Sequence, residues 1–550
     1  MLLKEGAAKT EDWKETERSP NGGDFRAPFA RGGQVLLRNS MVAGPPSKVQ
    51  SLAELALTIE NLKREGRKVV LCHGVFDLLH IGHIRHFSEA KALGDVLVVT
   101  LTEDRHVNKG PHRPAFTEAL RAEALAALGM VDYVAVSRYP DAQAVILQLQ
   151  PDIYAKGPDY KDASADVTGG IVKEREAIES VGGSIVFTED VTFSSSALLN
   201  RHWRAFDDGV ERYLQEFRSR YSARDVIEHV ERLSTMRVAV VGEAILDEYV
   251  YCDQLGKSAK DPVLAMRFES AEVFAGGALA VANHLAGFCR SVELVSYLGA
   301  NGDPHENLIR SSLKPNVRPN FIYKKSSPTI LKRRYIERVL FTKLFELYMI
   351  NDEPISEEEE GVLGSLLDAR LENVDLVVAA DFGHGLITPR IVAQLASSDR
   401  FLAVNTQVNA ANIRFHAISN YRRADYVCIN EGELRLDARN RTAAVDHLIG
   451  GLNEKLNCSR FLVTRGKSGV SYFESGRQVD SPSFAHNVVD RIGAGDAVLA
   501  ITSACAAAGT PPEILAFLAN VIGALKVEIM GNRSSVDRVS TIKFIESLLK

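Results

Sequence analysis

The sequence predicts an α/β protein built from two doubly wound domains. Apolar, strand-like runs alternate with helical segments in two separate stretches, residues 51–202 and residues 236–550. A chain of 550 residues is too long for one small module. Its composition, 45% hydrophobic and 25% charged, is that of a globular protein that buries sizeable cores. Two large domains therefore account for the length.

The elements follow this plan in order along the chain. Residues 1–50 are rich in Gly, Pro and mixed charge without periodicity, and are expected to form a loose extension. Residues 203–235 carry apolar side chains at helical spacing and predict a helical connector between the domains. The first domain has predicted strands at 68–77, 95–104 and 132–137, and the second at 237–249, 374–383, 401–407, 425–430 and 459–466.

Charge and cysteine content exclude several classes of protein. Lys and Arg number 65 against 71 Asp and Glu, a net charge of −6 that provides no broad basic field for nucleic acid or an anionic membrane. The six cysteines stand singly, without metal-ligand spacing. The N-terminus reaches acidic residues before any apolar core of a signal peptide. A cytoplasmic protein is expected, in which anionic ligands are held by local sites.

The first candidate site is the segment GVFDLLHIGHIRH, residues 74–86. His80 and His83 flank Gly82 where a strand gives way to a helix. Imidazole N–H groups and the positive end of a helix dipole can stabilise charge that develops on a phosphoryl group. Either histidine alone would be read as a structural residue of an ordinary α/β turn.

The GxFDxxHxGH string resembles that of the cytidylyltransferase-like nucleotidyltransferases. Further pieces occur in the family's order, with Lys109, Arg113, Arg121, Lys156 and Ser194–Ser196 at the matching positions. The resemblance implies a Rossmann-like fold in which a sugar or alcohol phosphate attacks the α-phosphate of ATP or CTP and pyrophosphate leaves. It implies roles for His80, His83 and Lys109 in catalysis and for Gly74, Phe76, Asp77, Gly82, Arg121, Lys156, Ser195 and Ser196 in nucleotide binding. Asp77 would orient the loop or help to place Mg²⁺, and Lys156 has a solvated surface lysine as its alternative.

The second candidate site is DRIGAGDAVLAITSACAAAG, residues 490–509. Gly493, Ala494 and Gly495 allow backbone N–H groups to converge at a helix N-terminus, which forms a hole for a transferring phosphoryl group. Asp496 stands where a base would take the proton from an attacking hydroxyl. The alternative is a glycine-rich helix cap with a capping aspartate.

The surrounding motifs are similar to those of the ribokinase-like (PfkB) carbohydrate kinases. GEAILDEY (242–249), the Gly276–Gly277 pair, NEGE (430–433) and TRGKSG (464–469) match the family's strings. The resemblance implies a kinase with a small lid sheet. It assigns ATP to Thr464, Gly466, Gly469, Gly493, Ala494 and Gly495, Mg²⁺ to Asn430 and Glu433, and the acceptor sugar to Asp247, Gly276, Gly277 and Asp381, with Asp496 as the catalytic base.

Departures from the family pattern gather on the sugar side. Glu243 replaces an aspartate, Ala280 replaces an asparagine, and DFGHG (381–385) replaces DYxKG. An altered acceptor pocket is therefore expected, because sites that hydrogen-bond hydroxyl groups discriminate strongly. Lys332 either meets a phosphate on the acceptor or lies on a solvated basic edge. Asp247 either accepts from a sugar hydroxyl or is a turn residue at a strand end.

Together the two resemblances are those of the bifunctional enzymes of ADP-heptose synthesis, in which the kinase comes first, whereas here it comes second. They imply a chain that phosphorylates a sugar or sugar phosphate with ATP and then makes a nucleotide-activated, heptose-like sugar from ATP or CTP, with Mg²⁺ as cofactor and a homodimer formed through the kinase. The alternative is a nucleotidyltransferase for a sugar or polyol phosphate whose kinase-like domain is a non-catalytic sensor or dimerisation module.

Overall fold

The structure, a computed structural model, describes residues 48–107, 114–157, 170–189, 206–300, 303–409, 412–413 and 416–549. Lys109, Arg113 and Ser194–Ser196, which the sequence predicts at the first site, lie outside these ranges. All six cysteines are buried and form no disulfide. Among the helices in the described part of the chain, none combines the length and apolar character that crossing a bilayer requires.

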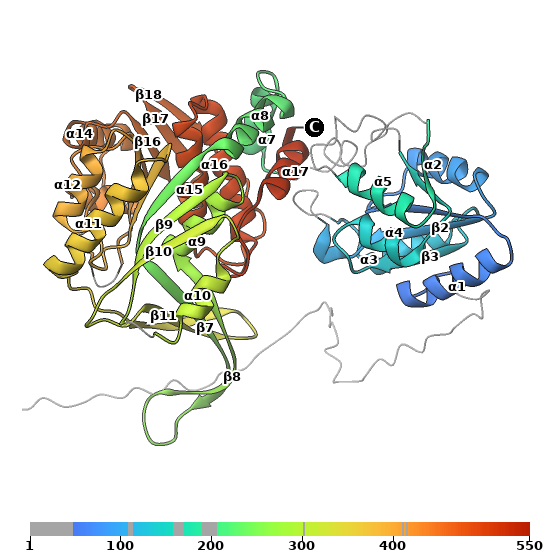
Figure 1. Cartoon of the computed structure of the whole chain (residues 1–550), viewed down its shortest axis with the longest axis horizontal. Helices are drawn as coiled ribbons and strands as arrows, with labels where there is room; N and C mark the ends of the chain where they lie inside the picture. The colour runs from blue at the N-terminus through green and yellow to red at the C-terminus, as the bar shows by residue number, and fades with distance from the viewer. Residues whose placement is uncertain are drawn as a thin grey trace, which may run out of the picture. The chain divides into compact units, whose positions relative to one another are not determined.

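The first domain is a parallel sheet covered by helices on both faces (Figure 1). Its described strands run in the order β3-β2-β1-β4-β5, as expected for a doubly wound sheet. The elements are α1 (Leu52–Arg64), β1 (Val69–Gly74), α2 (Ile81–Ala92), β2 (Val96–Thr102), α3 (Glu118–Ala126), β3 (Tyr133–Ser137), α4 (Ala142–Leu149), β4 (Ile153–Lys156), α5 (Gly170–Ser180) and β5 (Ser184–Phe187).

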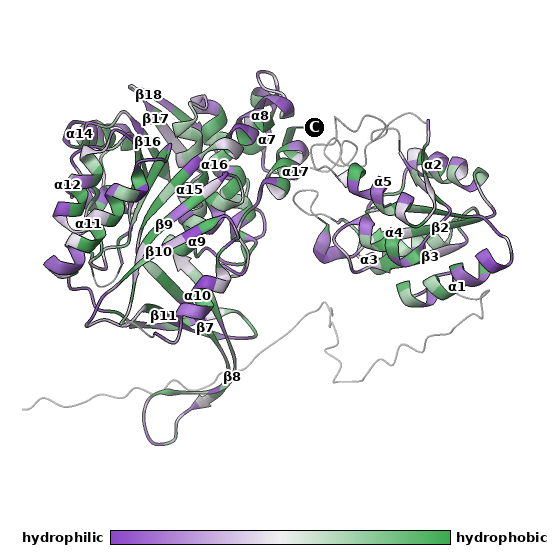
Figure 2. Ribbon diagram, viewed as in Figure 1, coloured by the Kyte–Doolittle hydropathy of each residue, from purple (hydrophilic) through white to green (hydrophobic). Residues whose placement is uncertain are grey.

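The central strands of this sheet are apolar on both faces. Every residue of β2 is buried, and so are the first four residues of β1. Parallel strands covered on both sides need such continuous apolar runs rather than alternation. Figure 2 shows the corresponding hydrophobic strands lying between helices whose outer faces are hydrophilic. The predicted strands of this domain are therefore confirmed in position and type.

The second domain has a larger main sheet. The described strands run in the order β10-β9-β6-β13-β14-β15-β16-β17-β18, with β10 to β16 parallel and the last two antiparallel. The strands are β6 (Arg237–Gly242), β9 (Ser291–Leu298), β10 (Val317–Tyr323), β13 (Leu376–Asp381), β14 (Phe401–Thr406), β15 (Tyr426–Asn430), β16 (Arg460–Thr464), β17 (Val470–Glu474) and β18 (Arg477–Ser481).

Helices cover both faces of this sheet. Two strongly apolar helices, α15 and α16, lie side by side in the core, and the small buried side chains of α15 allow the close approach. The helices are α9 (Ala278–Ala286), α10 (Glu306–Ser312), α11 (Glu357–Leu371), α12 (Pro389–Ser397), α13 (Glu431–Asp437), α14 (Val445–Leu456), α15 (Ala494–Ala507), α16 (Pro512–Val527) and α17 (Arg538–Leu549).

A second, four-stranded sheet extends from the second domain, and the lid sheet expected from the family resemblance is thereby confirmed. Its order is β12-β11-β7-β8, from β7 (Ala244–Lys257), β8 (Leu264–Gly277), β11 (Ile330–Glu337) and β12 (Thr342–Met349). The long β7–β8 hairpin projects away from the main sheet at the bottom of Figure 1. We refer to these four strands as the lid sheet.

The predicted connector forms two helices that pack into the second domain. These are α7 (Asp208–Arg218) and α8 (Ala223–Arg232). The Phe217 ring stacks on Phe517 of α16 with centroids 4.4 Å apart, and Arg218 Nε donates to the carbonyl of Leu548 at 2.9 Å. Both helices thus contribute apolar side chains to the core of the second domain.

Candidate functional site

The first site lies at the carboxyl end of β1, where α2 begins. His80 is the N-cap of α2, and its Nδ1 accepts a hydrogen bond from the N–H of Gly82 at 3.2 Å. An accepting Nδ1 places the proton of a neutral ring on Nε2, so His80 presents an N–H donor. The ring of His83, in the first turn of the helix, stacks on that of His80 with centroids 3.9 Å apart. The two histidines of the HIGH string therefore form one unit at a helix N-terminus.

The loop before these histidines is held in a constrained shape. Phe76 has a φ of 47°, and its ring lies so close to Gly74 that a Cβ there would be 3.0 Å from Phe76 Cζ. A side chain at residue 74 would therefore displace the ring that packs edge-on against His83. Asp77 Oδ1 accepts from the N–H groups of Ala115 at 2.6 Å and Phe116 at 3.3 Å. These contacts support the loop-orienting role that the sequence allowed for Asp77.

Two basic residues predicted to bind the nucleotide form ion pairs with carboxylates of the protein. Arg121 is almost fully buried, donates to the carbonyls of Phe116 and Thr102 at 3.0 and 2.8 Å and pairs with Asp104 at 2.6 Å. Lys156 Nζ pairs with Glu174 at 2.6 Å. These contacts give both side chains a structural part, and their role toward a nucleotide stays a prediction.

The second site lies at the N-terminus of α15. Gly493 is the N-cap residue with a φ of 76°, which a glycine adopts without strain. Within the described part of the chain, the N–H groups of Gly495 and Asp496 have no acceptor. They point out of the first helical turn, as all N–H groups there do, and offer two donors to an anion.

Asp496 lies in this first turn and is buried. Burial, followed by the charge of Asp247, raises its pKa to about 7, and the ammonium groups of Lys526 and Lys332 act in the opposite direction. A carboxyl group that changes its protonation near neutral pH can serve as a general base. The position and the pKa of Asp496 are therefore those required of the base that the sequence predicts.

Asp247 and Lys332 lie on neighbouring strands of the lid sheet and face the same site. They are directly paired in register, and both are buried. One oxygen of Asp247 binds Arg334, and the other lies 2.1 Å from where a Cβ on Gly276 would be, so a side chain there would displace the carboxylate. Gly277 has a φ of 57° and turns the chain from β8 into α9.

The ammonium group of Lys332 has no carboxylate partner or hydrogen-bond acceptor within the described part of the chain. Burial lowers its pKa, while the charges of Asp247 and, more weakly, Glu243 and Asp496 raise it. Its Nζ lies over the ring of Tyr348, 5.3 Å from the ring centroid. A buried ammonium without a partner is costly unless a ligand supplies the counter-charge. Lys332 is therefore suited to bind an anionic group.

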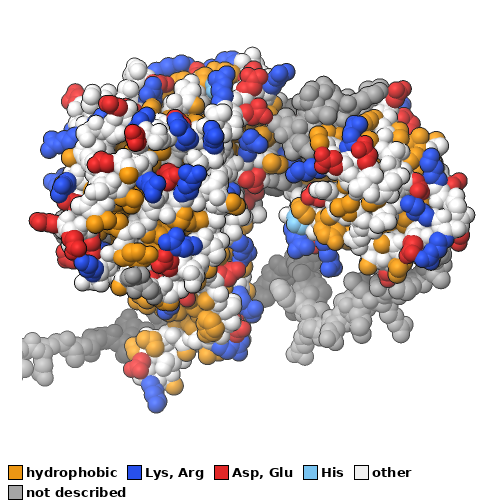
Figure 3. Space-filling view, in the orientation of Figure 1, with side chains coloured by type: hydrophobic (Ala, Val, Ile, Leu, Met, Phe, Trp, Pro, Cys, Tyr) orange, Lys and Arg blue, Asp and Glu red, His pale blue; other side chains and the backbone are white. Residues whose placement is uncertain are grey.

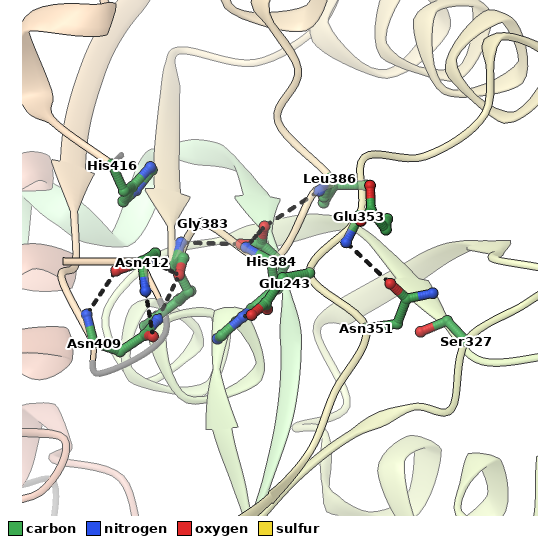
Figure 4. Close-up of polar contacts among 12 residues, drawn as sticks. Glu243, Ser327, Asn351, Glu353, Gly383, His384, Leu386, Asn409, Asn412 and His416 are labelled. Carbon is green, nitrogen blue, oxygen red and sulfur yellow. Dashed lines mark hydrogen bonds and ion pairs between the residues drawn. The ribbon is translucent and has the colours of Figure 1, made fainter. Parts of the chain in front are cut away.

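Glu243 supports a loop rather than facing a ligand. Its carboxylate is fully buried and accepts from the N–H groups of Phe382, His384 and Leu386 at 3.0, 3.1 and 3.3 Å (Figure 4). In the sequence, Glu243 is among the departures from the family pattern on the sugar side. In the structure, its carboxylate instead binds the backbone of residues 382–386. We refer to residues 382–386 as the acceptor loop.

Asp381, which the sequence predicts at the acceptor sugar, is surrounded by protein groups. Tyr421 donates to Oδ2 at 3.0 Å, the N–H of Gly383 donates to Oδ1 at 3.1 Å, and His416 lies 3.4 Å from Oδ1. Burial raises the pKa of Asp381 to about 7, against the charge of His416. These contacts make Asp381 a support of the acceptor loop, and contact with the sugar stays a prediction.

His384 is a residue of this site that the sequence motifs did not identify. It is fully buried, and its Nδ1 lies 2.6 Å from Asp352 Oδ1, while Nε2 has no partner among the described residues. Burial, followed by the charge of Lys332, lowers its pKa. A neutral ring that donates from Nδ1 to Asp352 has an accepting Nε2. The one available signal was its replacement of a lysine in the family string.

The residues predicted to hold Mg²⁺ form the cap of α13. Asn430 Oδ1 accepts from the N–H of Gly432 at 2.8 Å, and the oxygens of Glu433 accept from the N–H groups of Asn430 and Val408, each at 3.1 Å. Burial raises the pKa of Glu433. The described residues contain no cluster of three or more metal-ligating side chains. A Mg²⁺ that arrives with ATP needs only one or two protein carboxylates, so the donor set fits this ion.

The predicted nucleotide loop follows β16. Thr464 ends the strand, and Gly466 and Gly469 have φ values of 57° and 84°. A Cβ on Gly469 would lie 2.1 Å from the carbonyl oxygen of Ser481, so this turn requires glycine. The loop follows the carboxyl end of β16 and the α13 cap follows that of β15, and these strands are parallel neighbours in the main sheet. Ligands of open α/β sheets bind at this edge.

Relatives match only parts of the chain. The bifunctional protein HldE of Desulfatibacillum aliphaticivorans is 38% identical over 152 residues, which cover 27% of this chain and 30% of the relative. HldE of Koribacter versatilis is 27% identical over 301 residues, 54% of this chain and 60% of the relative. Arabidopsis thaliana ribokinase, solved with ribose and ATP, aligns with 57% of this chain and 99% of its own at 18% identity and a TM-score of 0.43.

Two family models match the chain in the order that the motifs predict. The cytidylyltransferase-like model matches residues 71–201, which contain His80 and His83. The model of the pfkB family carbohydrate kinases matches residues 235–538, more than half of the chain and the part that carries Asp496. The chain therefore belongs to the pfkB family of carbohydrate kinases and carries a cytidylyltransferase-like domain ahead of the kinase domain.

Proposed function

We propose that the chain is a bifunctional enzyme of sugar activation. Its C-terminal domain phosphorylates a sugar or sugar phosphate with ATP. Its N-terminal domain transfers a nucleotidyl group from ATP or CTP to a sugar 1-phosphate. The presence of both families in one chain supports the pairing, and the similarity to HldE proteins supports a heptose-like sugar. Because both reactions consume nucleoside triphosphates, we place the chain in the cytoplasm.

The observation that carries the kinase proposal is the position of Asp496 beside the N–H groups of the α15 N-terminus. Asp496 accepts the proton of the acceptor hydroxyl as that oxygen attacks the γ-phosphorus of ATP. The bond from the γ-phosphorus to the bridging oxygen breaks, and ADP leaves. The N–H groups of Gly495 and Asp496 stabilise the charge on the transferring group. Mg²⁺, when bound with ATP near Glu433, neutralises phosphate charge.

The acceptor is proposed to carry an anionic group. Lys332 is buried and has no partner in the described part of the chain. Its charge interacts with that of Asp496. A phosphate on the sugar would supply the missing counter-charge. The accepting Nε2 of His384 suits a hydroxyl of the same molecule. A phosphorylated sugar therefore satisfies both groups better than a neutral one.

The nucleotidyl transfer is proposed to occur at His80 and His83. An oxygen of the sugar phosphate attacks the α-phosphorus, and the bond to the leaving pyrophosphate breaks. The Nε2 proton of His80 and the N-terminus of α2 stabilise the charge that develops. The stacking of the two rings fixes their orientation before the substrate binds.

The test is to incubate the protein with Mg²⁺, ATP or CTP and a panel of aldose phosphates, with product detection by mass spectrometry. We expect Lys332→Met to raise KM for the phosphorylated acceptor at least 10-fold. Lys325→Met, which removes an exposed lysine paired with Glu358, is the matched control and should leave KM unchanged. Absence of both phosphorylated and nucleotidylated products from the whole panel would overturn the proposal.

A second candidate is a kinase-like domain that binds a ligand without phosphorylating it. The pairing of Asp247 with Arg334 favours this reading, because it occupies a carboxylate proposed to bind a sugar hydroxyl. Asp496→Asn separates the two. If the domain is a kinase, this substitution abolishes its consumption of ATP. If the domain is a sensor, the ATP consumption of the whole chain does not change.

We also propose a homodimer formed through the lid sheet. Its edge strands expose large apolar side chains, with Phe268 of β8 63% exposed and Phe345 of β12 56% exposed. Figure 3 shows hydrophobic side chains gathered over this part of the second domain. Edge strands with exposed apolar residues tend to associate with another surface. In a two-fold dimer, the same lid-sheet edge of a second copy supplies that surface.

Light scattering tests this assembly. Phe345→Asp should yield a monomer, whereas Leu57→Asp, which alters an exposed leucine of α1, should leave the mass at twice that of the chain. A mass equal to that of one chain for the unaltered protein would overturn the dimer proposal.

A further inference from the structure

Lys526 is a fully buried lysine directly behind the α15 N-terminus. It lies on α16, and its Nζ donates to the carbonyl of Ile492 at 2.8 Å and to that of Gly531 at 2.7 Å. Ile492 belongs to the loop that leads into the GAGD motif, and Gly531 to the loop between α16 and α17. A Cβ on Gly493 would lie 3.2 Å from Lys526 Cε. The lysine stem therefore lies against the backbone of the anion-binding turn.

Asp490 holds the same two residues from their other side. Its Oδ1 accepts from the N–H of Ile492 at 3.2 Å, and its Oδ2 accepts from the N–H of Gly531 at 2.9 Å. Asp490 also binds Lys343 of the lid sheet at 2.7 Å. Each of the two loops thus has one carbonyl bound by an ammonium and one N–H bound by a carboxylate.

The chemistry of this arrangement is that of a cation site. Carbonyl oxygens that converge on a buried positive charge, with a carboxylate nearby, are ligands for a hard monovalent cation as well as for an ammonium. The ammonium of Lys526 is close to a potassium ion in size, and the chain delivers it from a helix. Its charge also acts on Asp496, whose pKa it lowers against the effect of burial.

We propose that Lys526 is a positioning residue that acts as a built-in monovalent cation for the kinase centre. It fixes the loop that precedes Gly493, so that the N–H groups of the turn converge on the transferring phosphoryl group. The unaltered kinase then needs no added monovalent metal ion, and loss of the ammonium leaves a site that potassium can fill. This inference rests on the proposed kinase activity.

The test measures kinase turnover of the full chain in potassium, sodium or tetramethylammonium chloride at equal ionic strength. The unaltered protein should have the same kcat in all three salts. Lys526→Met, which removes the ammonium group and ends one atom earlier than lysine, should lose at least 10-fold in kcat in tetramethylammonium and regain most of it in potassium. The KM for the acceptor should change less than 2-fold, because Lys526 does not touch it.

A matched control is Lys324→Met. Lys324 is a second buried lysine whose ammonium binds two backbone carbonyls, those of Asn351 and Glu353, but it lies away from the α15 turn. Its loss should lower the melting temperature without making kcat depend on the choice of salt. The cytidylyltransferase-like domain provides an internal reference, since its turnover should not change in either variant.

Melting temperatures keep the proposal testable without turnover. Potassium should raise the melting temperature of Lys526→Met by several degrees relative to tetramethylammonium, and should leave the unaltered protein unchanged. A requirement of the unaltered kinase for potassium overturns the proposal, and so does full activity of Lys526→Met in tetramethylammonium. Absence of kinase turnover in the unaltered protein in every salt counts instead against the proposed function.

Discussion

At the scale of single residues, Asp496 changes its charge near neutral pH. Its pKa of about 7 arises from burial, with the charge of Asp247 as the next cause. A general base acts only as the carboxylate. We therefore predict that kcat/KM of the free kinase rises as pH rises from 6 to 8, with a midpoint near 7. The measurement is a pH–rate profile with initial rates, and a profile that is flat over this range would contradict the role.

The same pKa predicts a stability change in Asp496→Asn. The folded carboxyl keeps its proton up to about pH 7, whereas the unfolded one loses it near 3.8. The unaltered domain therefore loses stability as pH rises from about 4 to 7, by an amount on the order of a few kcal/mol. Asparagine does not titrate.

Thermal melting at two pH values checks this prediction. The variant should melt close to the unaltered protein at pH 4.5 and clearly above it at pH 8. An equal difference at both pH values would show that Asp496 has an ordinary pKa in the folded state.

At the scale of elements, side chains from other parts of the chain hold the acceptor loop. Glu243 accepts three backbone N–H groups of this loop, and Asn412 Nδ2 donates to the carbonyl of Phe382 at 3.0 Å. The departures at Glu243 and in DFGHG therefore touch each other, which explains why they occur together. These two departures change the residues that hold the acceptor loop in place. His384 and Lys332 are the side chains of the pocket that have atoms available to a ligand.

Glu243→Gln should destabilise this loop. The amide nitrogen of glutamine cannot accept, so at least one buried N–H loses its acceptor, at a cost of about 1–3 kcal/mol. Urea unfolding of the second domain measures the loss. Glu358→Gln, which removes the charge of an exposed surface pair with Lys325, is the control and should change stability by less than about 0.5 kcal/mol. Equal stability of the two variants would contradict the role of Glu243.

Elements with continuous apolar runs were predictable from the sequence. Strands such as β1, β2 and β13 are buried on both faces, so their composition alone marks them. The turns before α2 and α15 were predictable as well, because the first follows a strand end at Gly74 and the second places Gly493 and Gly495 just before an apolar helical run. The exposed strands β8 and β12 lack such runs and were not located individually.

Long-range contacts were beyond a single sequence. Glu243 meets partners 139 to 143 residues away, and nothing local distinguishes it from an exposed glutamate. In the sequence, Lys526 is simply a lysine at the end of an apolar helix. Its burial between two loops could not be predicted without knowing where those loops lie. Arg121 was found by its motif, but the partners that engage its guanidinium come from three separate segments.

At the scale of the whole molecule, helices α7 and α8 belong to the second domain. Leu214 and Phe217 of α7 and Val230 of α8 are buried in its core. A chain of residues 206–550 should therefore fold with a single cooperative melting transition. A chain of residues 236–550 exposes the apolar surface beneath both helices and should melt at least 5 °C lower or aggregate. Equal melting temperatures would contradict this assignment.

The two candidate centres are built from the same physical parts. Each uses the N-terminus of a helix, and each adds local charge or N–H donors in a chain whose net charge is −6. We propose that the kinase centre relies on Asp496, Lys332 and Lys526, and the cytidylyltransferase-like centre on His80 and His83. They share no described residue, so each should be removable without the other.

The central claim is that one chain carries two separable phosphate-transfer activities. The direct measurement is ³¹P NMR of the full-length protein with Mg²⁺, ATP or CTP, a panel of aldose phosphates and a panel of sugar 1-phosphates. We predict that Asp496→Asn abolishes ATP-dependent phosphorylation and keeps the release of pyrophosphate from sugar 1-phosphates. His83→Ala should do the reverse. Loss of both activities in either folded variant, or neither activity in the unaltered protein, would contradict the claim.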